Sequence, residues 1–170
     1  VIPFRRLRPL VWIVTAFTLA HSITLIGAVL GLAPDALWFP ALIETLIAAT
    51  VVFMALENIV GDPGERRRWM LALSFGLVHG FGFAFALQDT LQFAGERLFT
   101  ALLSFNVGVE IGQLLVIAAL APVLDALFRF VVEERKGAIV VSALVAHTSW
   151  HWLTERAEAL SLYGLDWVGV

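Results

Sequence analysis

The chain has 170 residues, of which 60% are hydrophobic and only 15% are charged, with a formal net charge of −3. A soluble domain is usually about 45–50% apolar and about 25% charged, and a small one would leave too much of this apolar surface in water. No basic stripe suggests a nucleic-acid partner, and the lack of cysteine excludes disulfides and thiolate metal sites. The composition therefore predicts an integral membrane protein whose solvent is the lipid bilayer.

Five apolar segments are predicted to be membrane-spanning helices, near residues 10–32, 40–60, 70–88, 99–121 and 138–156. Four are near or above the roughly 18 residues that a spanning helix needs, and the fifth is marginal. Helices are expected because lipid cannot satisfy open backbone groups. The connections are short and rich in turn residues, which favours antiparallel neighbours. We therefore predict an all-α fold, a polytopic transmembrane bundle of about five helices, in a single domain over residues 1–170.

Polar side chains interrupt the first three predicted helices. His21 lies near the centre of the first with Ser22 beside it, and His79 lies near the centre of the third. Glu44 and Asn58 are close to four helical turns apart in the second, so they share a face at opposite depths. Ionisable groups at the bilayer centre cost at least about 2–3 kcal/mol each and usually face the bundle interior. The blander interpretations are interhelical hydrogen bonds for the histidines and headgroup contact for Glu44.

The fourth and fifth predicted helices carry the most ordered polar patterns. Asn106, Glu110 and Gln113 are separated by four and three residues, so they stack on one helix face. His147 and His151 are one turn apart, and two imidazoles on one face can chelate a single divalent cation. Neutral imidazole and ionised carboxylate suit nickel, cobalt or zinc. The candidate metal ligands are His21, His79, Glu110, His147 and His151, with Ser22, Glu44, Asn58, Asn106 and Gln113 as supporting groups and no catalytic residue assigned.

Small residues at four-residue spacing indicate where helix backbones approach closely. Three glycine pairs have this spacing: Gly27/Gly31, Gly76/Gly80 and Gly108/Gly112. Each pair is predicted to lie at a helix contact, although incidental glycines would give the same pattern. Whether the chain also forms a homo-oligomer stays open.

The positive charges predict an orientation. If the five segments alternate in direction, one side of the membrane receives Arg5, Arg6, Arg8, Arg66, Arg67, Arg68, Arg129, Arg135 and Lys136. The other side receives only Arg97 and Arg156. The positive-inside rule then predicts a multi-pass protein of the inner (cell) membrane with its N-terminus in the cytoplasm and its C-terminus outside.

Four motifs together resemble the HupE/UreJ family of membrane proteins. They are FTLAHSITL (17–25), ETLIAATVVFMALEN (44–58), FGLVHGFGFA (75–84) and FNVGVEIGQ (105–113), and they follow the family's order. The resemblance implies a polytopic inner-membrane protein, and members near hydrogenase and urease genes are regarded as nickel or cobalt permeases. The family usually has an earlier helix with a Gly-x-Asp-His motif, which does not occur here. We therefore expect a fragment or processed chain that lacks an upstream helix.

Three functions follow from these residues. In the first, a metal-ion permease, His21, His79 and Glu110 form a mid-membrane transfer site, and His147 with His151 forms an outer entry site. In the second, an accessory membrane subunit, the polar residues join helices. The third is an intramembrane zinc-dependent hydrolase, in which His79, His147 and His151 hold zinc and Glu110 is the general base. The permease is preferred, so the protein is expected to be a transporter or binding protein rather than an enzyme.

Overall fold

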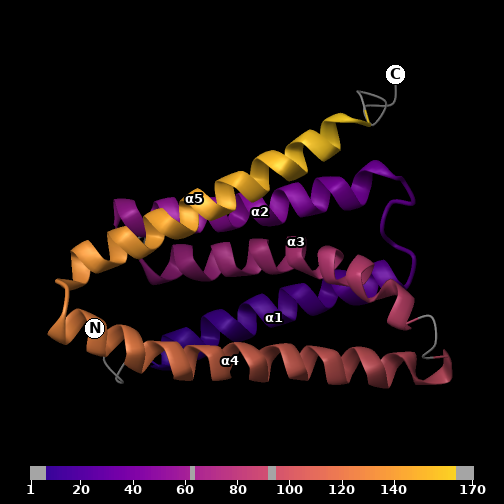
Figure 1. Ribbon diagram of the computed structural model, residues 1–170. Helices are drawn as coiled ribbons and strands as arrows, with labels where there is room; N and C mark the ends of the chain where they lie inside the picture. The colour runs from indigo at the N-terminus through magenta and orange to yellow at the C-terminus, as the bar shows by residue number, and fades with distance from the viewer. Residues whose placement is uncertain (1–6, 62–63, 92–94, 164–170) are drawn as a thin grey trace.

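The computed structural model describes residues 7–61, 64–91 and 95–163, and within these ranges it contains helices and no strand. The elements are α1 (Leu7–Val29), α2 (Trp38–Val60), α3 (Glu65–Leu91), a 3₁₀ turn η2 (Gly95–Arg97), α4 (Leu98–Phe130) and α5 (Glu134–Ser161). Figure 1 shows the five long helices running back and forth between two ends of the bundle. The predicted all-α fold is confirmed.

Four of the five helices, α1 to α4, are long and apolar enough to cross a membrane. This confirms the prediction of a multi-pass membrane protein. α5 falls outside this group although its stretch from Gly137 to Thr154 contains no charged residue. Its apolar character is reduced by His147, His151 and the hydroxyl side chains around them.

Several helix ends differ from the predicted limits, and for two of them the physical reason is clear. α1 ends at Val29 because a Schellman motif closes it: the Leu32 amide donates to the Gly27 carbonyl over 2.9 Å, and Gly31 has a φ of +80°. α4 continues through Pro122 to Phe130, beyond the predicted end near residue 121. Spanning helices tolerate an internal proline because their surroundings can satisfy the freed carbonyl.

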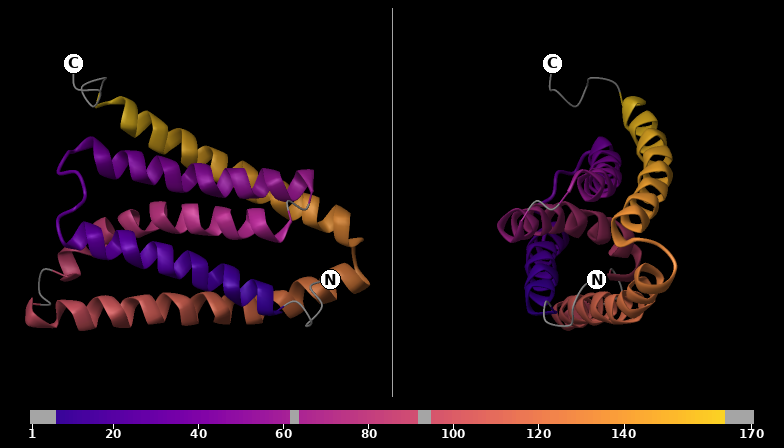
Figure 2. Two further views of the ribbon diagram at one scale, coloured as in Figure 1. Left: turned by 180° about the vertical axis from the view of Figure 1, so that it is seen from behind. Right: turned by 90° about the vertical axis from the view of Figure 1, so that its left-hand side faces the viewer.

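The helices form two pairs that lie side by side. α1 packs mainly against α3, and α2 packs mainly against α5. The contact between α2 and α3 joins the pairs, while α4 lies against α1 (Figure 2). The chain therefore has one group of helices, α1, α3 and α4, that shares an interior, and α5 lies outside this group on the far side of α2.

Glycines allow α1 and α3 to approach closely, as predicted for one of the three pairs. A Cβ atom at Gly76 would overlap the Phe17 carbonyl oxygen, and one at Gly80 would overlap the His21 carbonyl oxygen. Both obstacles are backbone atoms, which cannot move without separating the helices. No described residue lies within 4 Å of such an atom at Gly108 or Gly112, so the prediction of a helix contact there is wrong for the described part of the chain.

Arginines fix α5 against α2 at both ends. Near the start of α5, the Arg135 guanidinium donates to the carbonyls of Asn58, at 3.1 Å, and of Ile59. Near its end, Arg156 Nη1 lies 2.9 Å from Glu44 Oε2, close to the start of α2. α5 therefore runs antiparallel to α2 between the same two ends of the bundle (Figure 1).

Replacing Arg135 with Ala is expected to lower the free energy of unfolding by about 1 kcal/mol. The guanidinium satisfies carbonyls at the C-terminus of α2 that have no partner in the helix, and its charge complements the helix dipole. The measurement is thermal unfolding of the purified protein in detergent. Lys136→Ala is the matched control and should leave stability unchanged, because the described ion pair of Lys136 is with the exposed Glu133. Equal effects of the two substitutions would contradict this role for Arg135.

Candidate functional site

Hydrogen bonds between polar side chains join α1 to α4 inside the apolar bundle. The Thr15 hydroxyl donates to Glu110 Oε1 over 2.9 Å. The Thr18 hydroxyl donates to Gln113 Oε1 over 3.3 Å. We call the six residues of this contact the α1–α4 polar row: Thr15, Thr18, Ser22, Asn106, Glu110 and Gln113. The predicted stacking of the three α4 residues thus has a counterpart on α1.

The deepest contact of the polar row is between Ser22 and Asn106. The Ser22 hydroxyl lies 2.7 Å from Asn106 Oδ1 and 2.7 Å from the Thr18 carbonyl oxygen. Asn106 is buried, and its Nδ2 donates to the Leu102 carbonyl over 2.9 Å. The carboxamide therefore has a fixed orientation, with its oxygen directed at α1.

His21 is completely buried beside this row. Its exposed fraction is 0%, and neither ring nitrogen has a hydrogen-bond partner among the described residues. Aromatic rings surround it, with centroids 6.0 Å away for Phe17, 5.2 Å for Phe83 and 6.4 Å for Phe105. An unsatisfied buried polar group costs roughly 1–3 kcal/mol, so this imidazole has an unmet requirement for a partner.

His79 lies on α3, close to the same phenylalanine. The centroid of Phe17 is 5.3 Å from the His79 ring, so His21 and His79 both contact this one side chain. His79 Nδ1 is 2.8 Å from the Phe75 carbonyl oxygen. Because a carbonyl only accepts, Nδ1 carries the proton, and in the neutral ring Nε2 keeps its lone pair. The backbone thus selects the tautomer in which Nε2 can act as a ligand.

The structure does not unite all the candidate ligands. His147 and His151 contact each other on α5, with ring centroids 4.7 Å apart, and both are exposed in the chain. α5 packs against α2 and hardly at all against α4, so this pair is separate from the polar row. Among the described residues, no group of three or more His, Asp or Glu side chains is placed to hold a metal ion.

Two of the predicted supporting residues belong to the α2–α5 contact. Glu44 is engaged by Arg156 in the ion pair described above. Asn58 is exposed, and its carbonyl oxygen accepts from Arg135. Their structural partners are therefore the two arginines that fix α5.

Sequence reasoning missed two polar residues, one in the α1–α4 polar row and one beyond it on α4. Thr15 was overlooked, although Thr15, Thr18 and Ser22 repeat at intervals of three and four that mirror the α4 pattern. Asp125 lies further along the α4 helix, and its buried Oδ1 has no hydrogen-bond partner among the described residues. Its position after Pro122, beyond the predicted end of the fourth segment, concealed it.

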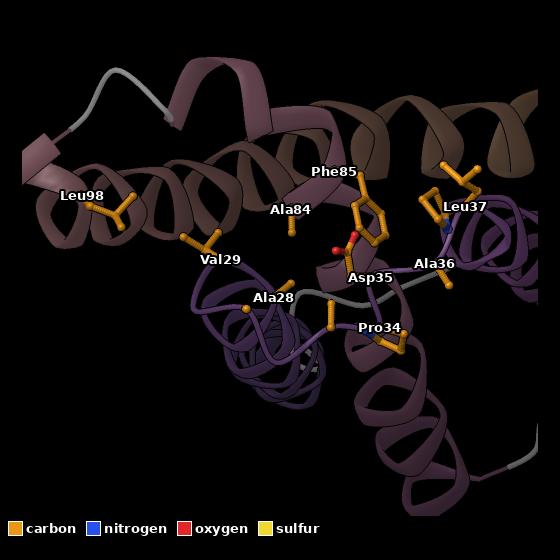
Figure 3. A pocket seen from close by; sticks show the side chains of 12 residues that line it. Ala28, Val29, Pro34, Asp35, Ala36, Leu37, Ala84, Phe85 and Leu98 are labelled. Atoms are coloured by element: carbon orange, nitrogen blue, oxygen red, sulfur yellow. The ribbon is translucent and has the colours of Figure 1, made fainter.

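A pocket of about 850 Å³ opens at the opposite end of the bundle from Asp125. Figure 3 shows the Asp35 carboxylate beside Phe85 in this pocket, with Leu98 on the α4 side. Its lining includes Ala84, which belongs to a buried apolar cluster with Leu25 and Leu102. Leu25 is one helical turn beyond His21 on α1, so this cluster separates the pocket from the buried histidine.

Comparison with known proteins gives one result. A model of the family described as HupE / UreJ protein matches residues 1–156, nearly the whole chain. No curated protein and no solved structure matches the sequence.

Proposed function

The chain belongs to the HupE/UreJ protein family, which is linked to nickel and cobalt uptake, and on this basis we propose that it is a membrane permease for one of these divalent cations. The observation that carries the proposal is His21, a fully buried imidazole without a hydrogen-bond partner among the described residues. Nickel and cobalt both accept imidazole nitrogen, so a passing cation would satisfy this group.

His21, His79 and Glu110 are the proposed transfer ligands. The imidazoles offer nitrogen lone pairs, and Glu110 offers the negative charge that makes a divalent cation tolerable at this depth. Asn106, Gln113 and Ser22 fix the orientation of α4 against α1. The cation should bind weakly and exchange readily, because a permeation site must release what it binds.

The proposed route ends at the pocket with Asp35 on one side and at Asp125, whose Oδ1 atom is buried, on the other. Between the pocket and His21 lies the apolar cluster of Leu25, Ala84 and Leu102, which must move for a hydrated cation to pass. The positive-inside rule supports an orientation with the pocket outside the cell, since the described basic residues at the α2–α3 and α4–α5 connections share the other end. α5 is proposed to cross the membrane beside α2, because its uncharged stretch lies between Arg135 and Arg156.

Metal binding to the detergent-purified protein tests the proposal. Titration with nickel and cobalt should show weak, reversible binding, and His21→Ala and His79→Ala should each lower the affinity at least about 10-fold. Leu115→Ala, at an exposed position on α4, is the control and should bind normally. If the wild-type protein binds neither metal, or if both histidine variants bind as the wild type does, His21 and His79 are not the transfer ligands.

An accessory subunit is the second candidate, favoured by the hydrogen bonds that join α1 to α4. In that case the polar row would only hold the helices together. Substitutions in it would then change stability and leave metal binding unaltered. The hydrolase has less support, because its three zinc ligands lie on helices that do not pack closely together: His79 is on α3, whereas His147 and His151 are on α5, which packs mainly against α2.

A further inference from the structure

The two histidines of α5 are exposed at a depth where a single chain offers them no partner helix. His147 and His151 lie in the uncharged part of α5, between Arg135 and Arg156. Their rings meet at 88° with centroids 4.7 Å apart. With α5 crossing the membrane as proposed above, both side chains would face lipid, which is unfavourable, so this surface of α5 is expected to be covered by protein.

The exposed face of α5 has the spacing of a helix-packing seam. Val140, Leu144, His147 and His151 follow at intervals of four, three and four residues. Val140 is 57% exposed and Leu144 is 64% exposed, and both histidines are exposed as well. A repeat of this kind directs one stripe of side chains toward a neighbouring helix. No described segment of the chain covers this stripe, since all four side chains are exposed and α5 packs mainly on α2.

The same pair is also half of a metal site. Zinc and similar borderline cations usually take about four ligands in a closed site, and His147 with His151 supplies two. No third His, Asp or Glu of the described residues is close enough to add to them. A second copy of α5 packed on this seam would supply the missing two, because a twofold axis repeats the same residues at the same depth.

We propose that two copies of this chain associate through the Val140–Leu144–His147–His151 stripe and bind one divalent cation between their four imidazoles. Axes of packed helices lie about 8–10 Å apart, a gap that opposed imidazoles can span to a shared ion. The cation stabilises the dimer, and the rest of the seam is apolar. The proposal does not depend on uptake, since it concerns α5 and not the α1–α4 polar row.

Zinc is the probe for the test, which measures the mass of the protein in detergent by light scattering, together with its zinc content. Zinc should convert the wild-type protein to a dimer. The double variant His147→Ala/His151→Ala should stay monomeric. Its zinc content should be lower than that of the wild type by one ion per two chains. Thr148→Ala, at an exposed neighbouring position off the stripe, should dimerise normally. A monomer that binds zinc through this pair, or a dimer that the double variant forms equally well, would overturn the proposal.

Cross-linking provides a second measurement that does not depend on metal content. The chain has no cysteine, so Leu144→Cys introduces a single thiol in the stripe. A bismaleimide should join two such chains when zinc is present and several-fold less when His151→Ala is added. Cross-linking that is the same with and without zinc would show that the histidines do not hold the interface. Neither experiment measures transport, so a negative result in either would leave the proposed permease function untouched. In the same way, an absence of nickel and cobalt uptake would not bear on the zinc-dependent dimer.

Discussion

Gly80→Ala is expected to destabilise the bundle by more than about 2 kcal/mol, although it adds a single methyl group. The new Cβ would overlap the carbonyl oxygen of His21 and the hydroxyl of Thr24, and it would lie 3.0 Å from the backbone nitrogen of Leu25. α1 could then pack on α3 only at a greater separation, which also displaces the buried His21. Unfolding of the purified protein in mixed detergent micelles measures the change.

Gly108→Ala is the matched control for that substitution. It adds the same methyl group to a helical glycine at which no described residue lies within 4 Å of the new atom. Because alanine favours helix over glycine by roughly 1 kcal/mol, this variant should be as stable as the wild type or slightly more so. If the two variants behaved alike, the close packing of α1 on α3 would not be a source of stability.

Glu110→Gln is expected to reduce nickel or cobalt uptake at least about 10-fold while the protein stays folded. Glutamine has the shape of glutamate, and its Oε1 can still accept the hydrogen bond from the Thr15 hydroxyl. The substitution therefore removes the negative charge and keeps the α1–α4 contact. Uptake into cells or vesicles and thermal stability are measured on the same preparation.

Thr15→Val is the complementary substitution to Glu110→Gln. It removes the hydrogen bond to Glu110 and keeps the carboxylate. Stability should fall by about 0.6 kcal/mol, the average for such contacts between membrane helices, and uptake should largely persist. If Thr15→Val stopped uptake and Glu110→Gln did not, the polar row would be acting as a structural joint, as the accessory-subunit hypothesis requires.

The fold class was predictable because the bilayer imposes it on the sequence. Each apolar segment must be a helix in lipid, and the segment lengths in the sequence match that solvent. Helix ends were less predictable because they depend on local contacts, such as the Schellman motif at Gly31 or the continuation of α4 past Pro122. The four-residue spacing of glycines marked a real helix contact at Gly80 but not at Gly108. Spacing alone does not reveal which face of a helix meets a neighbour.

For the candidate site, the sequence could predict which residues share a face of one helix, but not which helices pack together. The periodicity of Asn106, Glu110 and Gln113 correctly places these residues on one helix face, and the structure adds the hydroxyls of α1 that they meet. Which helices pack together is a tertiary property. For that reason the sequence alone could not separate His21, inside the α1–α3–α4 group, from His151 on the exposed face of α5.

The most direct test of the central claim is nickel and cobalt uptake by the purified protein in liposomes. The proposed permease predicts saturable uptake that exceeds that of protein-free liposomes and falls at least about 10-fold in His21→Ala and Glu110→Gln. Uptake by the wild-type protein that is no faster than in protein-free liposomes, from preparations shown to be folded, would contradict it.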